Sequence, residues 1–311
     1  MAESRGNRQD HSRYYRIAGL TINVRSERPF TDDTFHPELE LFRVRGAGRD
    51  TVTIRHHCPV PTLTGRELGP LFYKRPPWEI YRKGGRWTYV GITPDRDEPF
   101  QVAVFNDRHT NASIYSDERV SAEKYHHSLT FFPTDQLLLA RLLAERKGCY
   151  IHSCGVDLNG NGLVFAGHCD AGKSTMARKL SHKALILCDD RSIVRRGKDG
   201  FRIHGNWSHG DFPGVSPESA PLKALMFLEK AEENRLIRLQ DRREIIARLM
   251  PCLIRPFLTA DWWEKTLPVI GAIADKVPCY TLRSDRSGKI VRVLEEMFPR
   301  KDKEGKRGTQ G

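Results

Sequence analysis

The chain has 311 residues, 39% of them hydrophobic and 29% charged, with a formal net charge of +12. This length predicts about two domains, and the apolar content is sufficient for packed cores. No segment approaches the roughly 18 consecutive apolar residues that a membrane-spanning helix needs, so composition argues against a helical membrane protein. Residues 1–13 are polar and charged, which predicts a disordered N-terminus rather than a signal peptide or membrane anchor.

Cysteine usage and charge narrow the class further. The seven cysteines show no disulfide-framework spacing, which predicts reduced thiols and a cytoplasmic location. Neighbouring metal-ligand types such as His56-His57-Cys58 and His126-His127 lack zinc-motif spacing, so no structural zinc is expected. The positive charge suits anionic ligands, but part of it lies in a predicted disordered basic tail, 300–311. Neither nucleic acid nor a membrane is therefore an expected partner.

The first part of the chain, residues 14–130, is predicted to be a β-rich accessory domain. Short alternating runs such as Ile17–Val24 and Gln101–Phe105 are separated by turn residues. A hairpin is expected from Trp78–Arg82 to Arg86–Val90. Segment 131–147 is predicted to be a linker helix over 136–147, with Thr134 as its N-cap and a leucine-rich buried face.

Residues 148–299 form the predicted second domain. Cys149–Leu158 has strand character, and Asn159-Gly160-Asn161-Gly162 predicts a tight hairpin turn into the apolar run Leu163–Ala166. Directly after this run comes a complete G-x-x-x-x-G-K-S phosphate loop, formed by Gly167, His168, Cys169, Asp170, Ala171, Gly172, Lys173 and Ser174. Helix-forming residues follow from Thr175 onward.

The spacing of this loop predicts a cradle for nucleotide phosphates. Its glycines let the backbone wrap an anion, and the next helix offers its positive N-terminal end. Lys173 is expected to reach the β- and γ-phosphates, and the Ser174 hydroxyl to ligate Mg²⁺. The expected ligands are therefore ATP and Mg²⁺, held by residues 167–175.

Two acidic residues end the next predicted strand. The run Ala184–Cys188 is followed by Asp189, Asp190 and Arg191. Such a pair can hold Mg²⁺ and accept a proton from an attacking hydroxyl. Two adjacent carboxylates near a His and a metal can also hold one pKa high enough for base work. Asp189, Asp190 and Ser174 are the predicted metal ligands.

The stretch His152 to Arg191 resembles the catalytic core of HPr kinase/phosphorylase, a fold shared with nucleotide-dependent phosphoenolpyruvate carboxykinases. In that family a His heads the hairpin at the interval separating His152 from Lys173, and a strand ending in Asp-Asp-Arg follows. The resemblance implies an α/β fold, with an HPr kinase/PEP carboxykinase-like P-loop core behind an antiparallel hairpin lead-in. It implies that Asp190 is the proton acceptor, with Asp189 beside it and His152 close by.

Three departures from that family indicate a divergent branch. Thr175 stands where the family has Glu, and Arg202 stands at the position of a metal-binding Glu. The C-terminal signature that serves the reverse, phosphorylase reaction is absent. A second metal ligand is therefore unassigned, and weak or no phosphorylase activity is expected.

The sequence favours an ATP- and Mg²⁺-dependent serine kinase whose catalytic residues are Asp190, Lys173, His152 and Asp189. The expected acceptor is a Ser hydroxyl of a protein or peptide, and self-association into a homo-oligomer is left open. Two alternatives remain: a non-catalytic nucleotide-binding regulatory partner of a peptide-modification system, and a carboxykinase-like lyase. Because all the predicted site residues follow residue 128, nucleotide binding is expected to survive deletion of residues 1–128.

Overall fold

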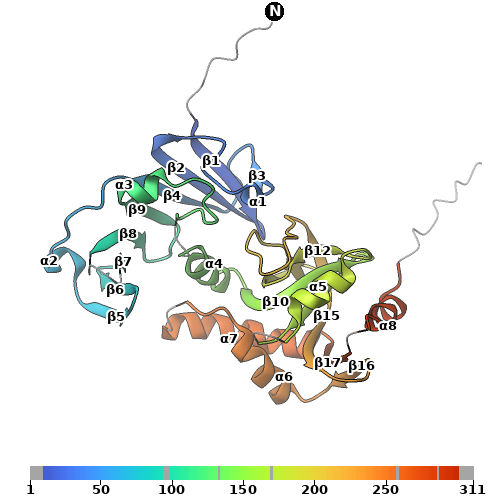
Figure 1. The fold of residues 1–311 in the computed structure, drawn as a ribbon. Helices are drawn as coiled ribbons and strands as arrows, with labels where there is room; N and C mark the ends of the chain where they lie inside the picture. Colours follow the sequence, from blue (N-terminus) through green and yellow to red (C-terminus); the bar gives the residue numbers. More distant parts are fainter. Residues whose placement is uncertain are drawn as a thin grey trace, which may run out of the picture. The chain divides into compact units, whose positions relative to one another are not determined.

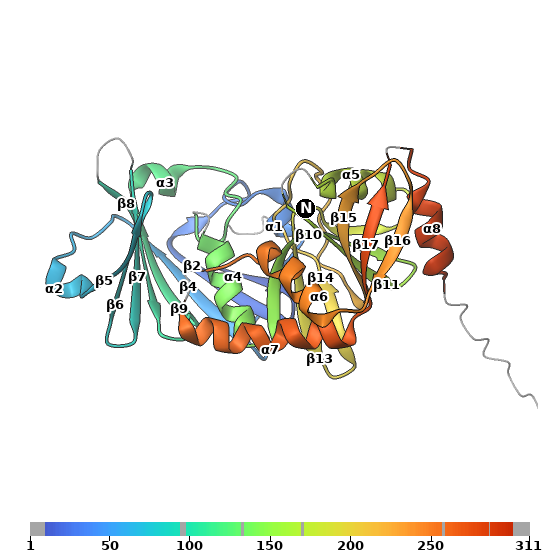
Figure 2. The same cartoon turned by 90° about the horizontal axis from the view of Figure 1, so that it is seen from below.

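The structure, a computed structural model, describes residues 10–93, 98–131, 134–168, 171–256, 259–285 and 287–300. These residues form a mixed α/β protein with two mixed sheets, shown in Figures 1 and 2. The chain divides into two compact units, Met1–Tyr150 with Ile254–Thr266, and Ile151–Leu253 with Leu267–Gly311. No helix among the described residues is long and apolar enough to cross a membrane.

The first unit is built on a nine-stranded sheet in the order β3-β1-β2-β4-β9-β8-β7-β6-β5. Its strands are β1 (Asp10–Ile17), β2 (Leu20–Phe30), β3 (Arg43–Val44), β4 (Thr51–His57), β5 (Leu71–Arg75), β6 (Trp78–Lys83), β7 (Arg86–Ile92), β8 (Pro99–Asn106) and β9 (Asn111–Ser116). β4 pairs in parallel with both β2 and β9, which makes the sheet mixed. The hairpin expected around residue 84 is confirmed as the antiparallel pair β6–β7.

Four helices precede the second unit in the sequence: α1 (Pro37–Glu40), α2 (Gly65–Leu68), α3 (Glu118–Ala122) and α4 (Thr134–Ala144). α4 starts at Thr134, so this residue is inside the helix and not its N-cap, and the helix ends three residues earlier than expected. Asp135 is buried and its carboxylate accepts hydrogen bonds from Leu129 N (2.7 Å) and Thr130 N (3.1 Å). The expected linker helix therefore has its contacts inside the first unit.

The strand β10 (Gly148–Leu158) starts three residues before the second unit, which contains the rest of it. The other strands of this unit are β11 (Asn161–Ala166), β12 (Leu185–Cys188), β13 (Arg191–Gly197), β14 (Gly200–His204), β15 (Ser219–Lys230), β16 (Arg235–Leu239) and β17 (Cys279–Ser284). The strand order is β11-β10-β13-β14-β15-β17-β16, and β12 pairs with β10. Because β11 also pairs in parallel with β15, the strands from β11 to β15 along this path close into a ring.

The helices of this part are α5 (Lys173–Leu180), α6 (Arg242–Leu249), η1 (Met250–Cys252), α7 (Ala260–Lys276) and α8 (Ile290–Met297). α7 contributes residues to both units, which the sequence boundaries at 130 and 148 did not anticipate. α5 and α8 share one apolar core with the sheet, through Met176 and Leu180 on α5 and Ile290 and Leu294 on α8. This packing fixes α5, and with it the end of the phosphate-loop segment.

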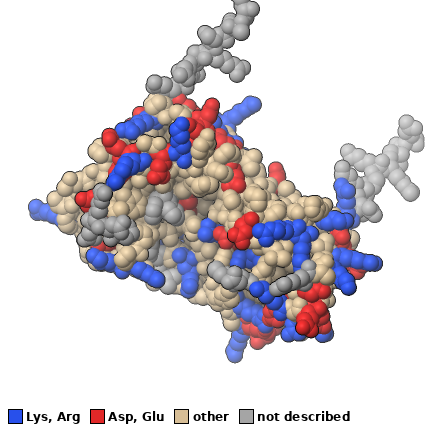
Figure 3. Space-filling model, viewed as in Figure 1, with Lys and Arg blue, Asp and Glu red and all other residues tan. Residues whose placement is uncertain are grey.

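On the face shown in Figure 3, Lys and Arg side chains are interspersed with Asp and Glu.

Candidate functional site

A hairpin and a following helix position the phosphate-loop segment. β10 and β11 pair antiparallel from Ser153↔Ala166 to Leu158↔Asn161, which confirms the predicted hairpin. Its turn residues Asn159 and Gly160 have positive φ angles of 58° and 80°, as a type I′ turn requires. β11 ends at Ala166, and α5 begins seven residues later at Lys173. The loop therefore joins a central strand to a helix N-terminus.

The described part of the loop has features of an anion cradle. Gly172 has a φ of +99° at the N-cap of α5, a conformation that favours glycine. The first turn of α5, which starts at Lys173, contains no acidic residue, as suits a helix end that faces an anion. Cys169 and Asp170, two of the predicted nucleotide-binding residues, lie outside the described residues.

Lys173 folds back over the loop. Its side chain is buried, and Nζ donates hydrogen bonds to His168 O (2.8 Å) and Gly167 O (3.2 Å). A buried ammonium satisfied by neutral carbonyls can exchange them for phosphate oxygens, which are stronger, charged acceptors. Ser174 is partly exposed beside it, whereas His168 and Thr175 are exposed.

The second candidate group is a His–Asp pair. His152 lies on β10, and Asp190 follows β12, which pairs with β10. His152 Nε2 lies 2.8 Å from Asp190 Oδ1, so the predicted closeness of these two residues is confirmed. The other carboxylate oxygen, Oδ2, lies 3.2 Å from Arg191 Nε. Both side chains of the His–Asp pair remain partly exposed, by 26% for His152 and 17% for Asp190.

The electrostatics of Asp190 differ from the sequence expectation of a raised carboxylate pKa. Burial pushes the pKa of Asp190 up, but the hydrogen bond from His152 and the charges of Arg191, His152 and Lys173 outweigh it and leave the pKa lowered. Asp190 is therefore ionised at neutral pH and can accept hydrogen bonds.

Asp189 is placed differently from its neighbour. Its side chain is fully buried, and the two oxygens accept hydrogen bonds from the backbone amides of Gly210 (2.6 Å) and Phe212 (2.9 Å). A Cβ atom on Gly210 would lie 3.1 Å from Asp189 Oδ2, so this close approach suits glycine. The carboxylate holds the segment 208–212 against the strand end.

Two further contacts secure this segment, and sequence reasoning missed them. The Cys188 thiol donates to Ser208 O at 2.8 Å, and burial raises its pKa to about 12, so it stays protonated. Arg191 also hydrogen bonds to the Ser208 hydroxyl. The only sequence signal was the placement of Cys188 and Arg191 on either side of the acid pair.

Arg202, at the expected position of a second metal-binding acid, lies on β14. It is exposed, and its guanidinium donates to Ser219 O (2.9 Å) and Ser219 Oγ (3.0 Å). No carboxylate therefore takes the place of the family's Glu at this position.

A cavity of about 710 Å³ lies beside the loop, at the carboxyl ends of β15 and β17. Met176 and Leu228 give it an apolar lining, and Lys179, Lys230 and Glu232 give it polar groups. Lys179 Nζ donates to Asp285 O at 2.6 Å, which joins α5 to the end of β17. Crevices outside the carboxyl ends of parallel strands are the usual ligand sites of open α/β sheets.

The comparisons with known proteins concern this same part of the chain. Residues 135–299, more than half of the 311-residue chain, match the family described as SynChlorMet cassette protein ScmC. No curated protein matches the sequence. Among solved structures, the chain is similar to the Hpr(Ser) kinase/phosphatase from Coxiella burnetii, with 10% identity and a TM-score of 0.30, over 48% of this chain and 92% of that one. The residues matched by the ScmC family include every candidate residue named above.

Proposed function

We propose that this chain, which belongs to the ScmC family of SynChlorMet cassette proteins, is an ATP- and Mg²⁺-dependent kinase that phosphorylates a Ser hydroxyl of a protein or peptide. The observation that carries the proposal is the 2.8 Å contact between His152 Nε2 and Asp190 Oδ1, together with the electrostatic effect on Asp190 of Lys173, the first residue of α5. Phosphoryl transfer needs a base for the attacking hydroxyl and positive charge on the transferred group, and these residues supply both.

The loop fits the phosphates of a nucleotide. Lys173 leaves the two loop carbonyls for the β- and γ-phosphates, and the N-terminal amides of α5 face the same anion. The cavity beside Met176 and Leu228 takes the nucleoside, because it offers apolar surface and polar groups next to Gly172.

The donor set for Mg²⁺ is narrower than the sequence indicated. Mg²⁺ is commonly held by one or two carboxylates together with substrate phosphates. We assign Ser174 Oγ and an Asp190 oxygen to this ion, which when bound neutralises charge on the phosphates. Asp189 we assign to positioning, because its side chain is fully buried and both its oxygens accept backbone hydrogen bonds, whereas Asp190 is partly exposed.

In the proposed step the acceptor hydroxyl loses its proton to Asp190 as its oxygen bonds to the γ-phosphorus. The bond from this phosphorus to the β,γ-bridging oxygen breaks, and ADP carries away the electron pair. His152 donates to Asp190 Oδ1 and so orients the oxygen that receives the proton.

The test is labelling of candidate peptides or proteins with γ-labelled ATP by the purified full chain. Lys173→Ala should abolish labelling and weaken nucleotide binding, because it removes the loop's cation. Lys198→Ala, which changes an exposed lysine in the turn between β13 and β14, is the matched control and should label as the wild type does. Wild-type labelling by Lys173→Ala would rule out this site as the catalytic centre.

A second change separates the base from the phosphate site. Asp190→Asn should keep nucleotide binding but lower turnover by roughly 10²- to 10⁴-fold, the usual range for a general base. Equal losses of binding and turnover would make Asp190 mainly a metal ligand.

One observation favours a second candidate function, a non-catalytic nucleotide-dependent partner. Arg202 stands at the position where the related family has a metal-binding Glu, and its guanidinium donates hydrogen bonds to Ser219. Tight binding of Mg-ATP without turnover over hours, in the presence of every candidate acceptor, would favour this alternative.

A further inference from the structure

Three side chains with metal-binding atoms meet in the first unit, whereas the residues proposed for phosphoryl transfer belong to the second. His36 precedes α1, Glu38 lies on α1, and His127 follows α3 along the chain. Their nearest ligand atoms all lie within 4.8 Å of one another. His36 Nδ1 is 3.2 Å from Glu38 Oε2, and the His36 and His127 rings stack with centroids 4.1 Å apart. Residues about 90 positions apart thus bring two imidazoles and one carboxylate together.

The backbone holds the two segments in this arrangement. His36 N donates to His126 O at 2.9 Å, and His126 N donates to Thr34 O at 2.9 Å. Between these bonds, Phe35 and His126 form a parallel bridge, and both side chains are buried. The donor atoms of His36 and His127 are therefore brought together by main-chain pairing rather than by chance contact of surface side chains.

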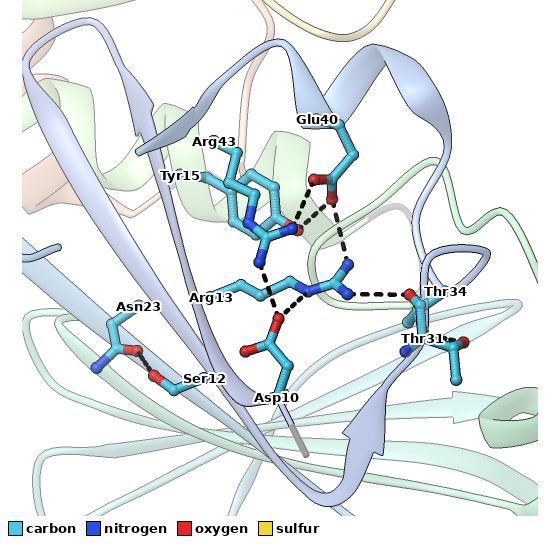
Figure 4. A network of polar contacts seen from close by, with 9 residues as sticks. All are labelled: Asp10, Ser12, Arg13, Tyr15, Asn23, Thr31, Thr34, Glu40 and Arg43. Carbon is cyan, nitrogen blue, oxygen red and sulfur yellow. Dashed lines mark hydrogen bonds and ion pairs between the residues drawn. The ribbon is translucent and has the colours of Figure 1, made fainter. Parts of the chain in front are cut away.

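α1 is itself anchored to the sheet, as Figure 4 shows. Glu40, at the end of α1, accepts hydrogen bonds from Arg13 (3.3 Å) and from the Tyr15 hydroxyl (2.9 Å) on β1, and from Arg43 (3.2 Å). Arg13 also binds Asp10 and Thr31 O, so the ends of β1 and β2 join the same network. Glu38, two residues before Glu40, is thus carried on a fixed turn. Ligands held in advance lose little entropy when they bind an ion.

One ring nitrogen of the cluster faces a carboxylate oxygen. His36 Nδ1 is buried and makes no hydrogen bond to any described residue, although it faces the Glu38 carboxylate. A ring nitrogen that faces a carboxylate oxygen carries either a proton, as in the neutral Nδ1–H tautomer, or a metal ion shared by both atoms.

The donor set selects the kind of ion. Mg²⁺ and Ca²⁺ prefer oxygen ligands, whereas two imidazoles with a carboxylate suit Zn²⁺ with a fourth position open to water. With bond lengths of about 2.0–2.1 Å, donors around a tetrahedral ion lie roughly 3.4 Å apart. The His36–Glu38 separation of 3.2 Å already matches this value. The His36 and His127 rings are stacked, with their planes 29° apart, so the exposed side chain of His127 has to turn out of the stack to direct a ring nitrogen at the same ion.

We propose that His36, Glu38 and His127 bind one Zn²⁺ ion, which ties the segment before α1 to the segment after α3. Sequence reasoning did not find this site, because His-x-Glu and a His 89 residues later match no zinc spacing. The site is independent of the proposed kinase activity.

The test is Zn²⁺ titration of the full chain after treatment with a chelator, in competition with a chromophoric chelator of known affinity. The wild type should bind one Zn²⁺ that His36→Ala and His127→Ala each weaken at least about tenfold, since even changes outside the ligand shell cost 10- to 100-fold. Glu38→Gln should weaken it similarly while keeping the side-chain shape. His182→Ala, an exposed histidine in the second unit, should bind as the wild type does.

A stability readout guards against variants that simply misfold. Zn²⁺ should raise the unfolding midpoint of the wild type but not that of His127→Ala, each compared with its own metal-free midpoint, because the substitution also removes the stacking of His127 on His36. Equal stoichiometry and affinity in the wild type and both His variants would overturn the proposal. So would Zn²⁺ binding that is lost in His152→Ala but kept in His127→Ala, because the ion would then lie in the kinase site. A protonated His36–Glu38 pair without metal would show no Zn²⁺-dependent difference at all.

Discussion

At the scale of single residues, the two neighbouring acids have different surroundings although they are chemically identical. Asp189 faces inward and accepts two backbone amides, whereas Asp190 is partly exposed and accepts from His152. Both residues follow the end of β12 at Cys188, where the chain bends. Their different partners separate a positioning carboxylate from one that can meet a substrate.

His152 should set the pH range over which Asp190 works. Burial raises the pKa of Asp190, and the hydrogen bond from His152 is the first of the contributions that lower it. His152→Ala removes that bond, so the pKa of Asp190 rises and the acid limb of the turnover profile moves to higher pH. The measurement is kcat against pH with saturating Mg-ATP. An acid limb that stays in place while kcat falls would show that His152 acts on something other than Asp190.

At the scale of elements, the junction of β11 and α5 depends on one backbone conformation. Gly172 has φ of +99°, and a Cβ built there meets no atom of the described residues within 4 Å. A methyl group at this position therefore makes no steric clash with these residues, and the cost of adding it comes from the strained backbone conformation.

Gly172→Ala should cost about 1–3 kcal/mol of stability and weaken nucleotide binding, because the alanine disfavours the conformation that opens the loop. Gly65→Ala is the matched control: its Cβ also meets no atom within 4 Å, but no positive φ is required there. Urea unfolding and nucleotide titration give the two readouts. Equal effects of the two substitutions would contradict the strain argument.

At the scale of the whole molecule, the first unit holds several neutral histidines in its interior. Burial lowers the pKa of His56 to about 3, and the pKa values of His109 and His126 to about 4. In the unfolded chain these groups titrate near pH 6.5. As pH falls below about 6.5, the unfolded state binds protons at these histidines and the folded state does not, so the free energy of unfolding falls.

Asp135 acts in the opposite direction. Burial raises its pKa to about 6, so between pH 6 and its unfolded value near 3.8 the folded state binds the extra proton. Between pH 7 and pH 5 the three histidines of the unfolded chain take up more protons than Asp135 does in the folded one, so the free energy of unfolding should fall. For each proton of this difference the fall is at most about 1.4 kcal/mol per pH unit. Urea titrations at several pH values test this. His56→Gln should flatten the dependence, and an unchanged slope would exclude His56 as a contributor.

The division into units changes where the chain can be cut. Leu138, Leu142 and Leu143 on α4 are buried in the first unit, and Arg146 forms an ion pair with Asp50. Deleting residues 1–128 removes β1–β9 and exposes that face of α4. A fragment designed to test whether the second unit binds nucleotide by itself should therefore follow the unit boundaries instead of starting at residue 129.

We expect the fragment 129–311 to aggregate, and a chain of residues 151–253 joined by a short linker to 267–311 to be more soluble, because the second follows the units. Size-exclusion chromatography and ATP titration of both fragments are the measurements. A monomeric 129–311 fragment that binds ATP as tightly as the full chain would contradict this.

The elements that the sequence predicted correctly depend on neighbours in the chain. Local turn chemistry and apolar patterning were enough to predict four of them: the Asn-Gly turn, the β10–β11 hairpin, the helix that begins at Lys173, and the strand before Asp189. The closeness of His152 and Asp190 followed from the family resemblance, and pairing of β10 with β12 provides it. The amphipathic helix α8 was missed.

What only the tertiary structure decided depends on contacts between distant residues. Three features leave no periodic or spacing signal in the sequence. They are the hydrogen bonds from the amides of Gly210 and Phe212 to Asp189, the assignment of residues 254–266 to the first unit, and the proximity of His36 and His127. The lowered pKa of Asp190 belongs to the same group, because it depends on burial and on charges brought together by folding. Local sequence determines which elements form and what chemistry they carry, whereas the partners of each side chain are set when chain closure brings remote segments together.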